Sequence, residues 1–157
     1  MKSGGSGGST AATSELLASE NEGWTELHEL IDSLTPPQVE LPGYYSEGWS
    51  AKDLVAHIGA WLAEAGICLE RIAAGTYRSE EIDVDAMNRA SLEAMRGLPF
   101  RTVHAQAWAA RTRMLAVWRT LPEPTPDAAF WIRKAGPEHY AQHLLRLREW
   151  VAELRSS

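Results

Sequence analysis

Proline and glycine are gathered at a few places in this chain, and the long stretches between them carry apolar residues at helical spacing. The breaker-rich stretches after the first residues are short: Pro36-Pro37, residues 41–43 and residues 121–126. Valine and isoleucine never alternate with polar residues over the length of a strand, and that alternation is typical of a half-buried strand. We therefore expect an all-α protein.

Start and stop patterns predict five helices. They span residues 14–34, 51–74, 83–95, 101–120 and 137–157. The helix at 51–74 has the clearest start, because Ser50 can cap its free backbone N–H groups while Asp53 bonds back to the cap. The last helix starts at Pro137, whose fixed φ and missing N–H suit a first helical position. The expected fold is a four-helix bundle, with residues 83–95 forming a short extra helix in a crossover.

The first residues differ in composition from the rest of the chain. Residues 1–9 are almost entirely glycine and serine, which have little to pack and a high backbone entropy. We expect residues 1–13 to form a flexible leader of artificial origin. The remaining residues, 14–157, are about the size of one ordinary domain.

Charge and cysteine usage narrow the classes of partner. The chain carries a formal net charge of −6 and has a pI near 5.4, so it offers no broad basic field to nucleic acid or to anionic membranes. Its single cysteine, Cys68, cannot form an internal disulfide, and no signal-peptide or membrane-spanning pattern is present. We expect a cytoplasmic protein that acts on a small molecule.

Three of the five histidines are candidates for metal binding. His139 and His143 are four residues apart, which places both imidazoles on one helix face, but such pairs also arise by chance. His57 lies in an apolar helix, where a buried imidazole needs a partner for each ring nitrogen or a metal ion in place of one. A core histidine bonded to a neighbour is the open alternative. His28 and His104 lack metal-type spacing and are expected to be structural.

Two segments carry a family resemblance. GWSAKDLVAHIGAW at residues 48–61, followed by HYAQHL at 139–144, resembles the DinB/YfiT-like superfamily, which includes the N-terminal domain of mycothiol-dependent maleylpyruvate isomerase and the ClbS/DfsB proteins. The resemblance spans nearly the whole chain after the leader and includes DVDAMN at 83–88. It implies a four-helix bundle that binds one divalent metal ion through His57, His139 and His143.

Three neutral imidazoles would leave positions on the ion open to water or substrate, as in catalytic metal sites. These ligands favour nickel or zinc over magnesium or calcium, and acid should release the ion. We expect a metal-dependent small-molecule enzyme, and the resemblance points to a low-molecular-weight thiol and to S-transfer or isomerisation. The alternatives are a metal-dependent hydrolase of the ClbS-like toxin-protection type and a non-catalytic metal- or ligand-binding bundle.

Four further residues are weaker candidates for this site. Glu64, two turns after His57, could be a general base, although a solvated glutamate explains it as well. Asn88 could line the pocket or serve a helix start. Trp61 and Trp131 could form apolar pocket walls or ordinary core packing. A homodimer formed through a helix face is compatible with a bundle of this kind.

Overall fold

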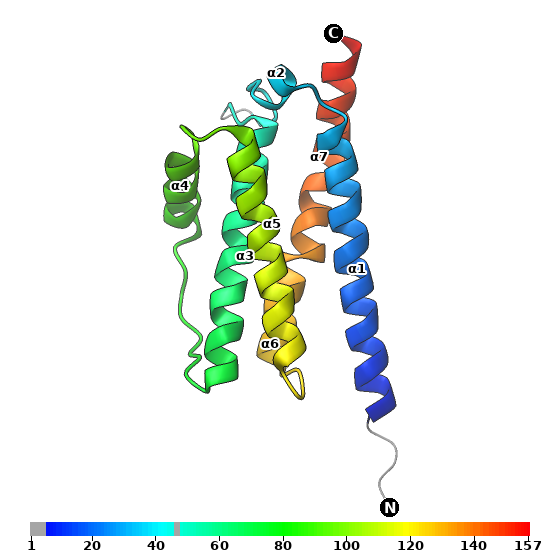
Figure 1. Cartoon of the computed structure of the whole chain (residues 1–157), viewed down its shortest axis with the longest axis vertical. Helices are drawn as coiled ribbons and strands as arrows, with labels where there is room; N and C mark the ends of the chain where they lie inside the picture. The colour runs from blue at the N-terminus through cyan, green and yellow to red at the C-terminus, as the bar shows by residue number, and fades with distance from the viewer. Residues whose placement is uncertain (1–5, 46–47) are drawn as a thin grey trace, which may run out of the picture.

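The computed structural model describes residues 6–45 and 48–157, and within these ranges all regular structure is helical. The helices are α1 (Ser6–Asp32), α2 (Pro36–Val39), α3 (Ala51–Ala74), α4 (Val84–Met95), α5 (Phe100–Thr120), α6 (Pro126–Ala135) and α7 (Pro137–Ser156) (Figure 1). None of the helices in this described part is both long and apolar enough to cross a bilayer. The prediction of an all-α fold is confirmed.

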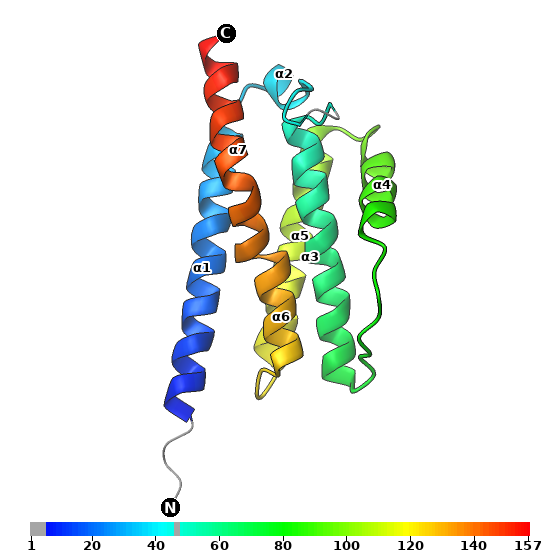
Figure 2. The ribbon, with the colours of Figure 1, turned by 180° about the vertical axis from the view of Figure 1, so that it is seen from behind.

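Two pairs of long helices make up the bundle. α3 packs along α5, and α1 packs along α7. α6 lies against α3 and leads at Gly136 into α7, so α6 and α7 together form the fourth arm of the bundle (Figure 2). The short α4 lies beside α3, and the segment 75–83 runs back along α3 to reach it (Figures 1 and 2). The predicted four-helix bundle with a short crossover helix is therefore confirmed.

Local sequence signals set the limits of α3. The Ser50 hydroxyl accepts a hydrogen bond from the Asp53 backbone N–H at 3.1 Å, and the Asp53 carboxylate accepts one from the Ser50 N–H at 3.0 Å. This reciprocal cap satisfies two of the donors that a first helical turn leaves free. At the other end the helix stops at Gly75, which adopts the left-handed conformation typical of a C-cap. The predicted limits of the helix that carries His57 are thus confirmed.

Two helices and one boundary differ from the prediction. α2 and α6 were not predicted, although each begins at a threonine cap followed by proline. α1 begins at Ser6 rather than Ser14, so it takes in residues 6–13 of the predicted leader, while residues 1–5 lie outside the described residues. A helix that has already formed extends at little cost, and Ala11 and Ala12 favour the extension.

A buried ion pair ties the two helix pairs together. The Glu20 carboxylate of α1 is 1% exposed and accepts hydrogen bonds from the Arg111 guanidinium of α5 at 2.6 and 2.8 Å. It also accepts one from the Tyr140 hydroxyl of α7 at 2.9 Å. A buried carboxylate is tolerated only when such charge-assisted bonds satisfy it. The network therefore fixes α7, which carries His139 and His143, relative to α1 and α5.

Candidate metal centre

The structure brings the three predicted ligands together between α3 and α7. His57 projects from α3, and His139 and His143 project from successive turns of α7; all three are buried. One possible ligand atom from each residue lies within 4.8 Å of the other two. The Nε2 atoms of His57 and His139 are 2.9 Å apart. Among the described residues, no other group of three or more histidine, cysteine, aspartate or glutamate side chains converges in this way.

The spacing and chemistry of these three side chains fit a transition-metal ion. Two nitrogens bound to one tetrahedral zinc ion at about 2.0–2.1 Å lie roughly 3.3 Å apart, and the His57 and His139 Nε2 atoms, 2.9 Å apart, are close to that separation. In neutral imidazoles that carry the proton on Nδ1, these two Nε2 lone pairs would face each other. A cation between them would remove that repulsion and bind both.

Burial keeps the three imidazoles in the form that a metal requires. Loss of solvation lowers the pKa of His57 to about 4, with a contribution from nearby His143. Loss of solvation lowers the pKa of His143 to about 4 as well. The same cause, together with the other two histidines, lowers the pKa of His139 to about 3. Because only a neutral imidazole can donate its lone pair to a metal, the site is ready to bind an ion at neutral pH without losing a proton.

Two tyrosines orient His143. The Tyr44 and Tyr45 hydroxyl oxygens each lie 3.0 Å from His143 Nδ1, and the Tyr44 hydroxyl also donates to the His143 carbonyl at 3.2 Å. With a proton on Nδ1 bonded to these oxygens, the Nε2 lone pair of His143 is free for a metal. Sequence reasoning missed both tyrosines. They lie 98 and 99 residues away from His143 along the chain, and no local pattern connects them.

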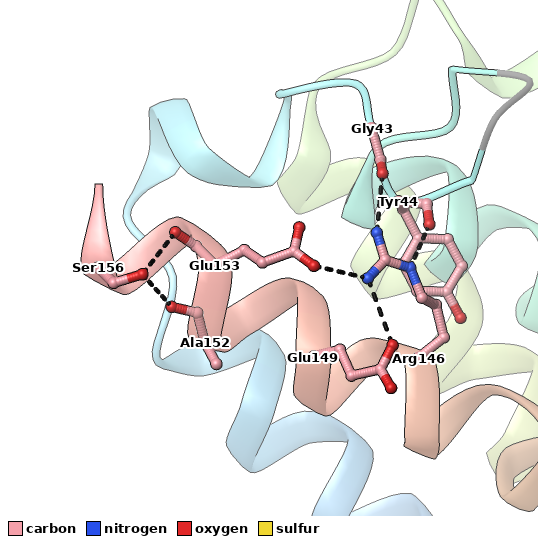
Figure 3. Close-up of polar contacts among 7 residues, drawn as sticks. All are labelled: Gly43, Tyr44, Arg146, Glu149, Ala152, Glu153 and Ser156. Atoms are coloured by element: carbon pink, nitrogen blue, oxygen red, sulfur yellow. Dashed lines mark hydrogen bonds and ion pairs between the residues drawn. The ribbon is translucent and has the colours of Figure 1, made fainter.

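Arg146, one turn after His143, holds the tyrosine-bearing segment in place (Figure 3). Its guanidinium donates to the carbonyl of Tyr44 at 2.7 Å and to that of Gly43 at 3.0 Å, and it is paired with Glu153 at 3.0 Å. Gly43 has a φ of 125°, and a Cβ there would lie 2.6 Å from the Trp150 ring, so only glycine fits. Arg146 therefore couples the loop to the helix that carries two of the ligands.

The three histidines lie in the wall of a pocket of about 620 Å³. Trp61, Asn88 and Trp131 also line it. The Trp61 indole donates to the Asn88 side-chain oxygen at 2.9 Å, and the Trp131 indole donates to the Tyr77 hydroxyl at 3.0 Å. Each indole of the pocket wall is therefore held by a hydrogen bond next to the imidazoles.

Glu64 and Cys68 do not line this pocket. Glu64 is not among the residues that line the pocket, and its carboxylate lies 3.8 Å from the Cys68 sulfur, one turn further along α3. Seven residues separate Glu64 from His57, or about 10 Å along a helix axis, which explains why it does not reach the imidazoles. Cys68 is buried in the core, as expected, and burial raises the pKa of its thiol to about 11.

Comparisons with known proteins point to the same kind of domain. The family model for the mycothiol maleylpyruvate isomerase N-terminal domain matches residues 21–154. Among solved structures, an uncharacterised protein from Escherichia coli UTI89 is similar in fold, with a TM-score of 0.74 and 15% identity over 89% of this chain and 92% of that chain. No curated protein matches the sequence. The chain therefore belongs to the mycothiol maleylpyruvate isomerase N-terminal domain family, which is part of the DinB/YfiT-like superfamily of metal-binding helical domains.

Proposed function

We propose that this protein is a metal-dependent enzyme that acts on a small molecule and uses a low-molecular-weight thiol for S-transfer or isomerisation. One observation carries the proposal: three buried histidines converge at a pocket large enough for a substrate. His57, His139 and His143 would hold one divalent ion, with nickel and zinc favoured by the nitrogen ligands. A cytoplasmic location belongs to the proposal, because the thiol must stay reduced.

A divalent ion held by His57, His139 and His143 would supply Lewis acidity, which favours the deprotonated form of a thiol. The side chains around the site orient its ligands and form the pocket wall. Tyr44 and Tyr45 fix the orientation of His143. Trp61, held by Asn88, gives an apolar wall that limits water near the imidazoles. The chain would then need no reactive cysteine of its own, consistent with the buried position of Cys68.

Metal content tests the first half of the proposal. Protein loaded with nickel or zinc and then desalted should retain about one ion per chain by elemental analysis. If it retains essentially none, the metal-dependent function is wrong.

Thiol dependence tests the second half. Loaded protein should turn over maleyl-type or other electrophilic substrates only when a thiol is added, since the chain brings no nucleophilic sulfur to the pocket. Equal turnover without thiol would favour metal-dependent hydrolysis, including the toxin-protection chemistry of the ClbS-like proteins. A chain that binds metal tightly yet turns over neither class of substrate would fit a binding role instead.

A further inference from the structure

The two helices that carry the candidate metal ligands make little direct contact with each other. α3, which carries His57, packs mainly along α5, whereas α7, which carries His139 and His143, packs mainly along α1. Among the described residues, no side chain caps the first turn of α7, to which His139 belongs. The separation of 2.9 Å between the His57 and His139 Nε2 atoms therefore depends on contacts that run through other helices.

A line of close contacts leads from His57 to α5. Gly59, two residues after His57, lies against Ala107 of α5, where a Cβ on the glycine would be 3.1 Å from the Ala107 Cα. Such a close approach leaves little room for α5 to shift along α3. Arg111 follows Ala107 by one helical turn, and its guanidinium donates to the Glu20 carboxylate at 2.6 and 2.8 Å. The position of Arg111 is therefore tied to that of His57.

Glu20 continues this line of contacts to the start of α7. Its carboxylate accepts a hydrogen bond at 2.9 Å from the hydroxyl of Tyr140, which directly follows His139 in the chain. Its side chain also packs on the backbone where α7 begins, since a Cβ at Gly136 would lie 3.2 Å from the Glu20 Cγ. The Tyr140 ring lies against Gly23, where a Cβ would be 3.0 Å from the ring Cδ2. The first turn of α7 is thus held by α1 at and beside Glu20.

We infer that Glu20 is a positioning residue for the metal centre: through Arg111 and Tyr140 it sets the position of His139 relative to His57. This inference rests on the proposed binding of a metal ion by the three histidines. Glu20, Arg111 and Tyr140 are not among the residues that line the pocket, so they act on the site only through the helices that they hold. The Glu20 carboxylate is 1% exposed, and its three charge-assisted hydrogen bonds fix the directions of its partners.

Cobalt(II) binding to the full-length protein tests this role. Tyr140→Phe is the mildest change, because it removes only the hydroxyl and leaves both the ring and the Glu20–Arg111 pair in place. It should weaken cobalt binding about fivefold, which corresponds to one lost hydrogen bond, and Glu20→Gln should weaken it about tenfold. Competition with a chelator measures these affinities. Both variants should also change the visible absorption of bound cobalt(II), which reports its coordination geometry.

Three comparisons separate positioning from a general loss of stability. Glu20→Gln combined with Tyr140→Phe should weaken cobalt binding by less than the product of the two single effects, because the hydroxyl acts through the carboxylate. Arg111→Lys keeps a charged partner for Glu20 and should lose less affinity than Arg111→Met. Leu27→Ala is the matched control. It removes a buried side chain two turns further along α1, so it should lower the free energy of unfolding and leave the affinity and absorption of cobalt unchanged.

Failure of the inference and failure of the proposed function give different results. If the wild-type protein binds no cobalt, the proposed metal site is wrong, and the inference fails with it. If the wild-type protein binds one ion, and Tyr140→Phe and Glu20→Gln bind it with unchanged affinity and absorption, the inference alone is overturned. An equal loss of affinity in Leu27→Ala and Tyr140→Phe would also overturn it, because the effect would then follow from stability and not from the position of His139.

Discussion

Histidines lie in both gaps between the two helix pairs, and the two groups are used differently. Between α3 and α7, the Nε2 atoms of His57 and His139 approach each other, His143 completes the group, and all three border a pocket. Between α1 and α5, the rings of His28 and His104 are 5.1 Å apart. The three imidazoles of the first group direct possible ligand atoms to one point, and the second group offers no third ligand among the described residues.

In the α1/α5 gap, aromatic packing and local hydrogen bonds occupy the imidazoles. His28 Nδ1 donates to the Trp24 carbonyl at 2.9 Å, and its ring lies 3.9 Å from the Trp24 ring. His104 Nε2 accepts a hydrogen bond from the Trp108 indole at 3.0 Å, and its ring stacks on Phe100. Because His28 Nε2 is also buried without a hydrogen-bond partner, the comparison teaches that the convergence of three imidazoles, and not burial or a free ring nitrogen alone, separates a candidate ligand from a structural histidine.

The largest effect should come from removing ligands on one side only. His139→Ala combined with His143→Ala should abolish stoichiometric zinc binding, because one imidazole cannot hold the ion at ordinary concentrations. His57→Ala should leave weaker residual binding by the remaining pair. His28→Ala combined with His104→Ala should still bind one ion per chain in equilibrium dialysis. If the two double variants lose metal equally, the comparison between the two gaps fails.

The pH dependence of the metal-free protein should be the next largest effect. Because the folded pKa values of His57, His139 and His143 are about 4, 3 and 4, against about 6.5 in the unfolded chain, the unfolded state binds more protons. The contribution that these neutral imidazoles make to the free energy of unfolding is fully present above pH 6.5. It is lost as the pH falls toward about 4. Each histidine can cost up to about 1.4 kcal/mol per pH unit in that window.

Urea unfolding in the presence of a chelator at pH 7, 6 and 5 measures this dependence. His143→Gln removes one of the three titrating groups and should reduce their part of the slope by about a third. The same pKa values sharpen the expectation of acid release: metal affinity should change little from pH 7.5 to 5 and fall near pH 4. Release already complete at pH 6 would mean that the imidazoles are not kept neutral by burial.

Thermal unfolding gives a smaller effect that still separates the two gaps. A metal that binds only the folded state, at a hundredfold excess over its dissociation constant, stabilises it by about 2.7 kcal/mol, or roughly 5–10 °C for a chain of this size. His57→Ala should lose most of this rise in Tm. His28→Ala should lower the Tm of the metal-free protein, since it removes a packed ring, yet keep the full rise on adding zinc.

The smallest effect concerns the groups that orient a ligand. Tyr44→Phe combined with Tyr45→Phe should weaken zinc binding about tenfold, because His143 loses the partners that hold its ring. Tyr77→Phe is the matched control, since that hydroxyl bonds Trp131 in the same pocket and contacts no histidine. A competition titration with a zinc chelator compares the three proteins. Equal affinities would show that the tyrosines serve packing alone.

A feature of this fold could be predicted from the sequence when the residues that determine it lie close together in the chain. The limits of α3 were predicted because Ser50, Asp53 and Gly75 act within a few residues of themselves. α6 was missed although Thr125 caps it and proline follows, since ten residues beside a proline-rich stretch look like a loop. The predicted ligands depended on a family resemblance, because nothing in the spacing of His57 and His139 implies that they meet.

The groups around the histidines could not be predicted for the same reason. Tyr44 and Tyr45 contact His143 through long-range packing, since α7 packs against α1 and Arg146 donates to the loop carbonyl. Glu64 shares a helix face with His57, so periodicity alone could not separate them. The structure separates them by distance along the axis and by which of the two borders the pocket.

The close packing of α3 on α5 has a consequence for what a bound ion would connect. At Gly59, two residues after His57, a Cβ would lie 3.1 Å from the Ala107 backbone, so the two helices are in backbone contact there. His57 therefore lies on a helix that packs closely on α5, whereas His139 and His143 lie on α7, which packs along α1. An ion bound by all three histidines would link α3 to α7 and so connect the two helix pairs. Metal binding should therefore slow hydrogen exchange most at the backbone amides of α3 and α7 that lie next to the three histidines.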